Sequence, residues 1–279
     1  FPLSRAATNQ WRQAMNGFER HSIDHGSASM VNDAINKPGK FIAQRCFKND
    51  WPIGSAGDRG NAIEAGIEQV VVYGKTIEEA IAYAYKIYDA DVALKLTDRF
   101  VQSNREKIEL GIMMGVEAFK PYGKALEPEA DPSRPERKPQ HKVKINCKTP
   151  DWELPIIGYL DFVFPNPPSG IPTIIDLKTT ARVPNRMPKD HQRQRAIYAA
   201  AKPGYDVKFL YVSPASTVTL EDGDVSQIMS DMKKALIRWE RFLNLGDADF
   251  LASIVPMAPD DSEFNTTARK ELLREKFGF

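Results

Sequence analysis

Two acidic residues and a lysine stand inside apolar, strand-like segments near the middle of the chain. Asp161 lies in the apolar segment 154–164, and Asp176 and Lys178 lie in the segment 171–179. An ionised carboxylate or ammonium group in a buried strand destabilises the fold unless it is paired or bound to a metal ion. Charged residues interrupt an apolar segment twice within a short stretch of this chain, a pattern that is typical of an active site.

The spacing within the second segment predicts how its side chains are divided between two faces. Asp176 and Lys178 are two positions apart in a predicted strand, so their side chains point to the same face. Ile175 and Leu177 point to the opposite face, where we expect them to pack in the core.

A turn rich in proline, residues 165–170, separates the two apolar segments and predicts a hairpin-like connection. If the strands pair across this turn, Asp161 and Asp176 meet at one edge. Neighbouring carboxylates repel each other unless a cation lies between them, and oxygen ligands without a His/Cys cluster suit Mg²⁺ or Mn²⁺. A nearby lysine can orient a water molecule and neutralise charge on a phosphate. The alternative is a buried Asp176–Lys178 ion pair with Asp161 capping a turn, although a plain ion pair rarely needs a third buried acid.

Composition limits the other classes of function. The 279 residues carry a net charge of +1, so any nucleic-acid-binding signal must be local. The two cysteines, Cys46 and Cys147, form neither a disulfide framework nor metal-ligand spacing, which fits a reducing compartment. No apolar run has the length of a signal peptide core or a membrane span. We therefore expect a cytoplasmic protein that has no membrane partner.

Helical periodicity dominates the first part of the chain, and strand-like alternation begins near residue 141. Thr76 and Glu79 form a capping-box pattern at the start of one helix. The predicted helices are 4–18, two short helices within 27–46, one from Asn61, then 77–95, 97–120, 189–202, 224–245 and 266–276, with 47–60 as a loop. The predicted strands are 141–148, 154–164, 171–179 and 206–213. This order predicts an α/β or α+β core wrapped by an N-terminal helical subdomain.

Four regions follow from these patterns. We expect an N-terminal helical part over 1–120, an exposed charged loop over 121–140, a core over 141–246 and a C-terminal extension over 247–279.

A resemblance to a known family rests on four short motifs in this order. They are Arg59-Gly60-x-x-x-Glu64, Gly158-Tyr-Leu-Asp161, Asp176-Leu-Lys178-Thr179 and Gln194-x-x-x-Tyr198. Together, over about residues 55–215, they resemble the PD-(D/E)XK nuclease superfamily. The last motif resembles the mark of its RecB-like exonuclease branch. The resemblance implies a restriction-endonuclease-like core, with a mixed central β-sheet flanked by helices.

The resemblance also implies roles for single residues. Asp161, Asp176 and Glu64 would hold Mg²⁺ or Mn²⁺, the Leu177 carbonyl would contribute, and Lys178 would position the attacking water. On helix spacing alone, a solvated face is the better interpretation for Glu64 and Glu68. The Gly60 match changes that preference for Glu64 only.

Further residues are expected to contact DNA. Gln194 and Tyr198 are four positions apart, so they share one helix face, and the resemblance places them at the cleft. The stretch from Lys178 to Arg195 is rich in cations, which could guide phosphates into the cleft or simply form a solvated loop. Its candidate DNA-binding residues are Arg182, Arg186, His191, Arg193 and Arg195.

Two features of the family are missing from this sequence. The two cysteines cannot supply the four ligands of the iron–sulfur cluster found in some RecB-like nucleases, so we expect no cluster. No helicase-type phosphate-binding loop is present, which indicates a stand-alone nuclease.

The leading hypothesis is a metal-dependent DNA exonuclease of the kind that phages and bacteria use in recombination, repair and DNA processing. Its expected partners are DNA and a recombination annealing protein, and a phage enzyme would act in the host cytoplasm. An endonuclease on the same core is the second hypothesis. A catalytically silent DNA-binding module and a metal-free phosphate-binding protein are the others, but neither requires the buried Asp161, Asp176 and Lys178.

Overall fold

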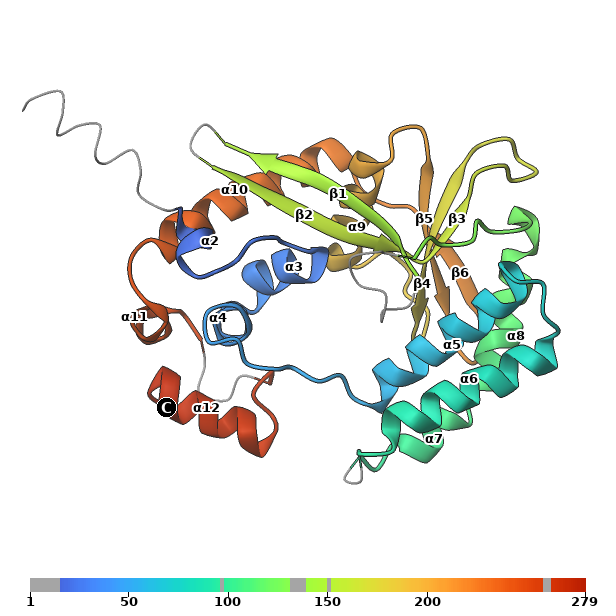
Figure 1. Cartoon of the computed structure of the whole chain (residues 1–279), viewed down its shortest axis with the longest axis horizontal. Helices are drawn as coiled ribbons and strands as arrows, with labels where there is room; N and C mark the ends of the chain where they lie inside the picture. The colour runs from blue at the N-terminus through green and yellow to red at the C-terminus, as the bar shows by residue number, and fades with distance from the viewer. Residues whose placement is uncertain (1–15, 96–97, 131–138, 150–151, 258–261) are drawn as a thin grey trace, which may run out of the picture. The chain divides into compact units, whose positions relative to one another are not determined.

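The computed structural model describes residues 16–95, 98–130, 139–149, 152–257 and 262–279. The chain has a mixed α/β fold, in which helices accompany a four-stranded mixed sheet and a separate two-stranded sheet (Figure 1). Within the described ranges, no helix combines the length and apolar character needed to cross a bilayer. The predicted helix over 4–18 lies mostly outside the described residues, and its predicted end differs, because Asn16 caps the start of a short helix, α2 (Gly17–Arg20).

The chain is divided into two compact units, each assembled from segments far apart in sequence. Unit 1 contains the described residues within 1–51, 145–157 and 229–279, and unit 2 contains those within 52–144 and 158–228. These divisions differ from the sequence-based regions. Boundaries between the two units fall inside three elements, which are β1 (His141–Lys148), β2 (Glu153–Leu160) and α10 (Val225–Leu243).

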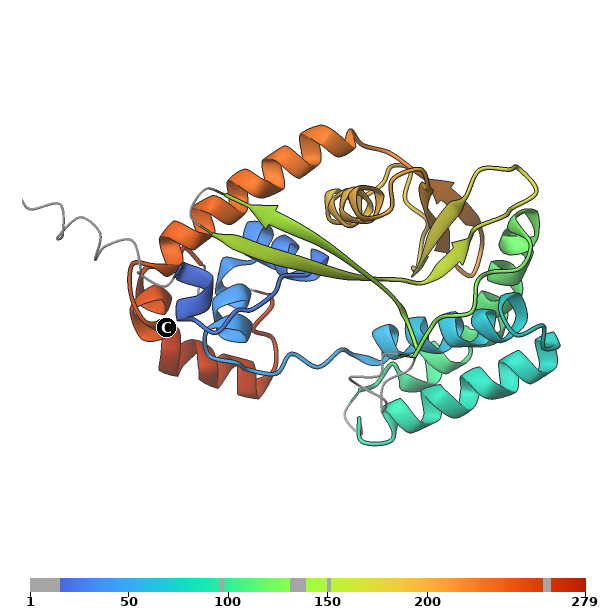
Figure 2. The ribbon, with the colours of Figure 1, turned by 45° about the horizontal axis from the view of Figure 1, so that its top comes forward.

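The sheet of unit 2 has the strand order β3-β4-β5-β6. Figure 2 gives a second view of the ribbon in the colours of Figure 1. Its strands are β3 (Phe162–Phe164), β4 (Thr173–Thr179), β5 (Asp206–Val212) and β6 (Thr217–Leu220). The β3–β4 pair is antiparallel, which confirms the predicted hairpin. The β4–β5 pair is parallel, and helix α9 (Lys189–Ala201) connects these two strands.

The two faces of this sheet are covered by different groups, as the side-chain alternation predicts. Ile175, Leu177 and Leu210 belong to one hydrophobic core with residues of the N-terminal helices. Phe209 and Tyr211 form a second cluster on the alternate positions of β5. The prediction that Ile175 and Leu177 pack in the core is confirmed, and Asp176 and Lys178 occupy the intervening positions.

The N-terminal helices of unit 2 are α5 (Ser55–Val71), α6 (Ile77–Val92), α7 (Val101–Arg105) and α8 (Ile108–Phe119), followed by the 3₁₀ turn η2 (Lys120–Tyr122). The capping box is confirmed. Glu79 N–H donates to Thr76 Oγ1 over 3.2 Å, and Thr76 N–H donates to Glu79 Oε2 over 2.9 Å.

Two helix boundaries in this unit were wrong. Helix α5 begins at Ser55, inside the predicted loop 47–60, because the Asp98 side chain accepts the Ser55 N–H over 3.0 Å and caps it from a distant segment. The predicted helix 97–120 is two helices, with a turn at residues 106–107.

Two strand boundaries also differ. The predicted strand 154–164 is interrupted at Asp161, which lies between β2 and β3. Strand β6 was not predicted, because its four residues alternate threonine with apolar residues and lie half-exposed at the sheet edge.

The segment 121–140 is only partly the exposed loop that we expected. Ala125 is buried and its N–H donates to Val71 O over 3.0 Å, while Leu126 N–H donates to Val163 O over 2.7 Å. Residues 131–138 lie outside the described part of the chain.

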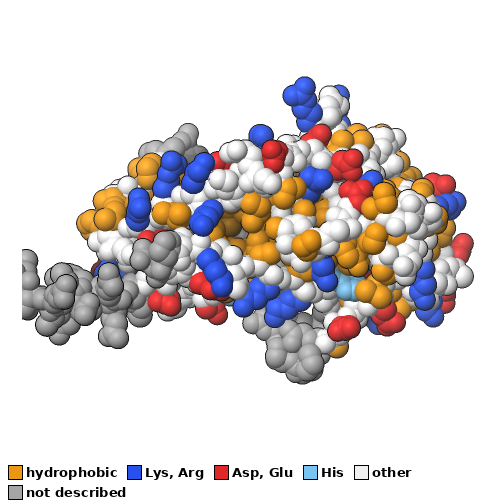
Figure 3. All heavy atoms as spheres, turned by 90° about the horizontal axis from the view of Figure 1, so that it is seen from above, with side chains coloured by type: hydrophobic (Ala, Val, Ile, Leu, Met, Phe, Trp, Pro, Cys, Tyr) orange, Lys and Arg blue, Asp and Glu red, His pale blue; other side chains and the backbone are white. Residues whose placement is uncertain are grey.

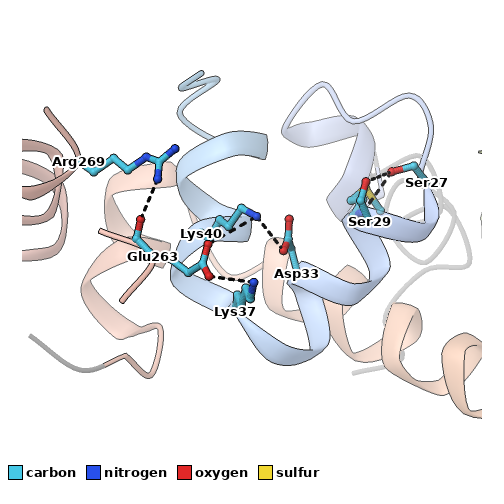
Figure 4. A network of polar contacts seen from close by, with 8 residues as sticks. Ser27, Ser29, Asp33, Lys37, Lys40, Glu263 and Arg269 are labelled. Atoms are coloured by element: carbon cyan, nitrogen blue, oxygen red, sulfur yellow. Dashed lines mark hydrogen bonds and ion pairs between the residues drawn. The ribbon is translucent and has the colours of Figure 1, made fainter. Parts of the chain in front are cut away.

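Unit 1 includes helices α3 (Ala28–Asn36), α4 (Pro38–Arg45), α11 (Ala248–Ile254) and α12 (Thr267–Phe277). Ion pairs connect α4 with the segment that precedes α12 (Figure 4). The Lys37 and Lys40 ammonium groups lie 2.8 Å and 3.7 Å from the Glu263 carboxylate, and Lys40 lies 3.2 Å from Asp33. Arg269 donates to the Glu263 backbone carbonyl over 3.4 Å.

Candidate active site

The β3–β4 register brings the two aspartates together. Phe162 pairs with Ile175, so the next position along this register places Asp161 opposite Asp176. Strand β3 begins only after Asp161, and the Asp161 side chain continues the contact between the strands. Its Oδ2 accepts the Leu177 N–H over 2.8 Å. A carboxylate therefore replaces a backbone acceptor where the ladder ends.

Asp176 is fully buried beneath the site. Its Oδ1 lies 2.5 Å from Lys178 Nζ, and its Oδ2 accepts a hydrogen bond from Gln194 Nε2 over 2.8 Å. Burial, followed by the Asp161 carboxylate, raises the pKa of Asp176, Lys178 partly offsets both effects, and the pKa is about 7 as a result. Within the described structure, Asp176 Oδ1 makes this ion pair but has no hydrogen-bond partner.

Lys178 is the cation that pairs with Asp176, and its side chain retains 26% exposure. Burial lowers the pKa of Lys178, but the carboxylates of Asp176, Asp161 and Glu64 outweigh this effect and leave the pKa raised. The ammonium group therefore stays charged at neutral pH. It also lies 5.4 Å from the centroid of the Phe209 ring, so one of its sides contacts an aromatic face.

A chain of hydrogen bonds from α9 holds Asp176 in place. Gln194 Nε2 also donates to Tyr198 Oη over 2.7 Å, and Tyr198 Oη donates to the Tyr159 carbonyl over 2.7 Å. Burial, followed by the charge of Asp176, raises the pKa of Tyr198, so its hydroxyl remains a donor. A Cβ atom on Gly158 would come within 2.7 Å of Tyr198 Cε1, which explains the glycine at this position of β2.

Helix α5 carries the third acidic residue towards the end of β4. A Cβ atom on Gly60 would lie 2.9 Å from Thr179 Oγ1, so glycine permits the close approach of helix and strand. The Glu64 charge is near enough to raise the pKa of Lys178. Glu68 is 7% exposed and does not line the cleft, so the expectation that it lies on a solvated face was wrong.

These groups lie in and below a cleft of about 1030 Å³ whose lining belongs entirely to unit 2. The walls come from α5, the segment before α7 and α7 itself, the residue before α8, the end of β4 and the loop after it, α9 and one residue of β5. The charged lining residues and the histidine are Arg59, Glu64, Asp98, Lys107, Asp161, Lys178, Arg182 and His191. The cleft thus combines an acidic centre with cationic walls.

The structure separates the predicted basic stretch into different environments. Arg182 and His191 line the cleft. Arg186 is exposed and outside the lining, and Arg193 lies 3.0 Å from Asp190. Arg195 donates to the backbone carbonyls of β5 and the loop before α10, over 2.8 Å to Val207 O and 3.3 Å to Gly223 O.

The pitch of α9 explains why His191, Arg193 and Arg195 differ, because residues close in sequence point in different directions around a helix. Arg182 and Arg186 precede this helix, in the loop after β4. The face shown in Figure 3 likewise has basic and acidic side chains interspersed.

His191 contacts the cleft as a neutral imidazole. Its Nδ1 lies 2.7 Å from Tyr211 Oη, and its ring stacks on Phe209 with 5.6 Å between centroids. Burial, followed by repulsion from Lys178, lowers the pKa of His191 to about 4. An uncharged ring is thereby placed next to the Lys178 ammonium group.

Sequence reasoning missed several lining residues. Arg59 Nη1 donates to Asn104 Oδ1 over 2.8 Å, and Asn104 Nδ2 donates to Ser55 Oγ over 2.9 Å. Lys107 and Tyr211 also line the cleft. Arg59 could have been predicted, because it precedes Gly60 in the first motif. No local sequence pattern identifies the other residues as part of the cleft.

The residues present suit a hard divalent cation in their donor chemistry. Asp161 and Asp176 supply carboxylate oxygens, and the buried Asp176 Oδ1 makes an ion pair with Lys178 but no hydrogen bond. Across the described ranges, no three His, Cys, Asp or Glu side chains form a ready metal-binding group. The carboxylate pair is therefore the part of the site that the structure brings together, and Glu64 as a third ligand remains a prediction.

Comparisons with known proteins add little. No family model matches the chain, and no curated protein is similar to it. Among solved structures, the chain is similar to the crystal structure of SSO0001, with a TM-score of 0.34 and 13% sequence identity over 75% of this chain and 84% of that one. A likeness at this level supports no conclusion about function.

Proposed function

We propose that this chain is a metal-dependent DNA exonuclease with a PD-(D/E)XK core of the RecB-like type. One observation carries the proposal. Asp176 and Lys178 share one strand face next to Asp161, at the base of a cleft that also contains Glu64. A buried carboxylate whose pKa is raised, together with a charged lysine in a cleft, is unfavourable for stability and typical of catalysis.

Asp161 and Asp176 would hold Mg²⁺ or Mn²⁺, with Glu64 and the Leu177 carbonyl as further ligands. When bound, such a cation lowers the pKa of a coordinated water and neutralises charge on a phosphate oxygen. The oxygen-rich donor set and the absence of cysteine ligands favour these metals over zinc.

The chain's own residues would do the rest of the chemistry. Lys178 carries a positive charge at neutral pH and can hold the attacking water and stabilise charge that develops on the phosphate. Gln194 and Tyr198 fix the orientation of Asp176 through the hydrogen bonds described above. Arg182 would contact the phosphate backbone from the cleft wall.

The proposed substrate is DNA, and the proposed setting is recombination, repair or phage DNA processing in the cytoplasm. A recombination annealing protein is the proposed protein partner.

Digestion of end-labelled linear DNA and closed circular DNA with Mg²⁺ tests the proposal. The parent protein should shorten linear DNA and leave circles intact, and Asp176→Ala should be inactive. Asp91→Ala is the matched control, because Asp91 is an exposed aspartate on α6 outside the cleft. Nicking of circles would support an endonuclease instead. Equal activity of Asp176→Ala and the parent would refute the site, and no cleavage by any of them would favour a silent DNA-binding module.

A further inference from the structure

Phe100 is an exposed aromatic residue in an otherwise polar part of the cleft. It is 54% exposed and lines the cleft wall near Arg59, Ser103 and Lys107. Single exposed apolar side chains are common on protein surfaces. Among the large hydrophobic side chains exposed in the described ranges, however, Phe100 is the one that lines this cleft.

The backbone of Phe100 is firmly attached to the helices that build the cleft. Asp98 Oδ1 accepts the Phe100 N–H over 2.9 Å, and Asp98 Oδ2 accepts the Ser55 N–H over 3.0 Å. The Phe100 carbonyl accepts the Asn104 N–H over 2.9 Å at the start of α7. One carboxylate therefore links Phe100 to α5, the helix that carries Glu64. These hydrogen bonds hold the backbone that carries the Phe100 ring in place relative to α5.

One cation lies against the ring, and two more line the same cleft. The Arg99 guanidinium carbon lies 4.8 Å from the centroid of the Phe100 ring, and Lys107 and Arg59 line the same cleft. Within the described part of the chain, none of these three residues forms an ion pair with a carboxylate. An aromatic face flanked by cations that lack acidic partners matches the composition of single-strand binding grooves, where bases stack on rings and phosphates contact Lys and Arg.

We infer that Phe100 stacks on a nucleobase of an unpaired DNA strand, while Arg59 and Lys107 bind the adjacent phosphates. In an intact duplex the face of each internal base is covered by its neighbours, so a ring on the protein can reach a base only where the strand is unpaired. The inference rests on the proposed function, because it defines the substrate of the same cleft as single-stranded DNA or a frayed end.

Binding measured without metal tests the inference separately from cleavage. The probe is a fluorescein-labelled oligodeoxythymidylate of about 12 nucleotides, within the usual range of single-strand site sizes. Its anisotropy is followed in EDTA, with relaxed closed circular duplex as an unlabelled competitor. Phe100→Ala should weaken binding between about 5-fold and 100-fold, the range expected for one base–aromatic stack.

Three variants make the comparison specific. Phe100→Trp should retain the affinity of the parent, and Phe100→Leu should lose affinity although it keeps an apolar side chain. Tyr83→Ala is the matched control, because Tyr83 is an aromatic residue of unit 2 that is 42% exposed on α6 and does not line the cleft. It should bind as the parent does.

The two proposals fail in different ways. Parent-like binding by Phe100→Ala, duplex competition as strong as that of an unlabelled single strand, or no binding by the parent would overturn the inference, whether or not DNA is cleaved. Single-strand binding that depends on Phe100, with no cleavage under Mg²⁺, would support the inference and refute the nuclease.

Discussion

Replacing Asp176 by asparagine should change the stability of the metal-free protein in opposite directions at high and low pH. Burial raises the pKa of this carboxyl from 3.8 to about 7 in the folded protein. Between these two values the folded state binds more protons than the unfolded state, so the stability of the fold falls as pH rises through this window. Ionised Asp176 therefore destabilises the fold, and the effect is greatest above pH 7.

The magnitude follows from the size of the pKa change. At roughly 1.4 kcal/mol for each pKa unit, ionisation costs about 4 kcal/mol at pH 8, about 2 kcal/mol at pH 5 and below about 1 kcal/mol at pH 4. Asparagine avoids this cost and keeps an oxygen that can accept the Gln194 hydrogen bond. Its amide hydrogens would face Lys178, and a buried donor without a partner costs about 2 kcal/mol. The variant should thus be about 2 kcal/mol more stable than the parent at pH 8 and about 1 kcal/mol less stable at pH 4.

Urea unfolding in EDTA, followed by circular dichroism at pH 4, 5 and 8, measures the difference. Asp91→Asn removes an exposed carboxylate from α6 and should change stability by less than about 0.5 kcal/mol at each pH. If Asp176→Asn is less stable than the parent by the same amount at all three pH values, ionisation of Asp176 does not change the stability of the fold and the reasoning fails.

Other changes probe the remaining parts of the structure. Gly158→Ala places a Cβ atom 2.7 Å from Tyr198 and should lower the free energy of unfolding by about 1–3 kcal/mol in urea titrations; parent-like stability would mean that Tyr198 moves freely. Lys178→Ala should lose turnover in single-turnover assays but largely keep DNA binding by anisotropy, and an equal loss of both would contradict a transition-state role. Mg²⁺ should raise the Tm of the parent but not that of Asp176→Asn in thermal melts, since a metal bound elsewhere would raise both. Thr76→Ala removes the capping box and should lower the free energy of unfolding by about 0.5–2 kcal/mol while kcat stays unchanged. A thermal melt with the Tm of the parent would show that the cap does not stabilise the protein.

Local patterns predicted the parts of the fold that depend on neighbours in sequence. The Thr76 capping box depends on residues three positions apart, and the opposite faces of β4 depend on strand alternation. The start of α5 could not be predicted in the same way, because its cap is the side chain of Asp98 from a distant segment. The short edge strand β6 was missed because half-exposed strands carry a weak apolar signal.

The candidate site shows the same division. The hairpin turn and the β4 alternation were enough to expect Asp161 beside Asp176, because two strands joined by a short turn have few possible registers. The apolar segments led us to expect that all three charged residues are buried, but only Asp176 is, whereas Asp161 and Lys178 are half-buried. Burial raises the pKa of Asp176 and lowers that of His191. Nor could the sequence show that Arg195 bonds to backbone carbonyls rather than lining the cleft.

Strand alternation and turn chemistry act over a few residues, so they were enough to place two acids and a lysine in one region of a sheet. The surroundings of these residues depend on how distant segments pack. Packing against α5 and α9 sets which charges lose their water, and the hydrogen bonds of Gln194 and Tyr198 set the orientation of Asp176. The capping of α5 by Asp98 holds Phe100 at the cleft through the same carboxylate. These effects depend on distances between segments remote in sequence, and such distances exist only once the chain has folded.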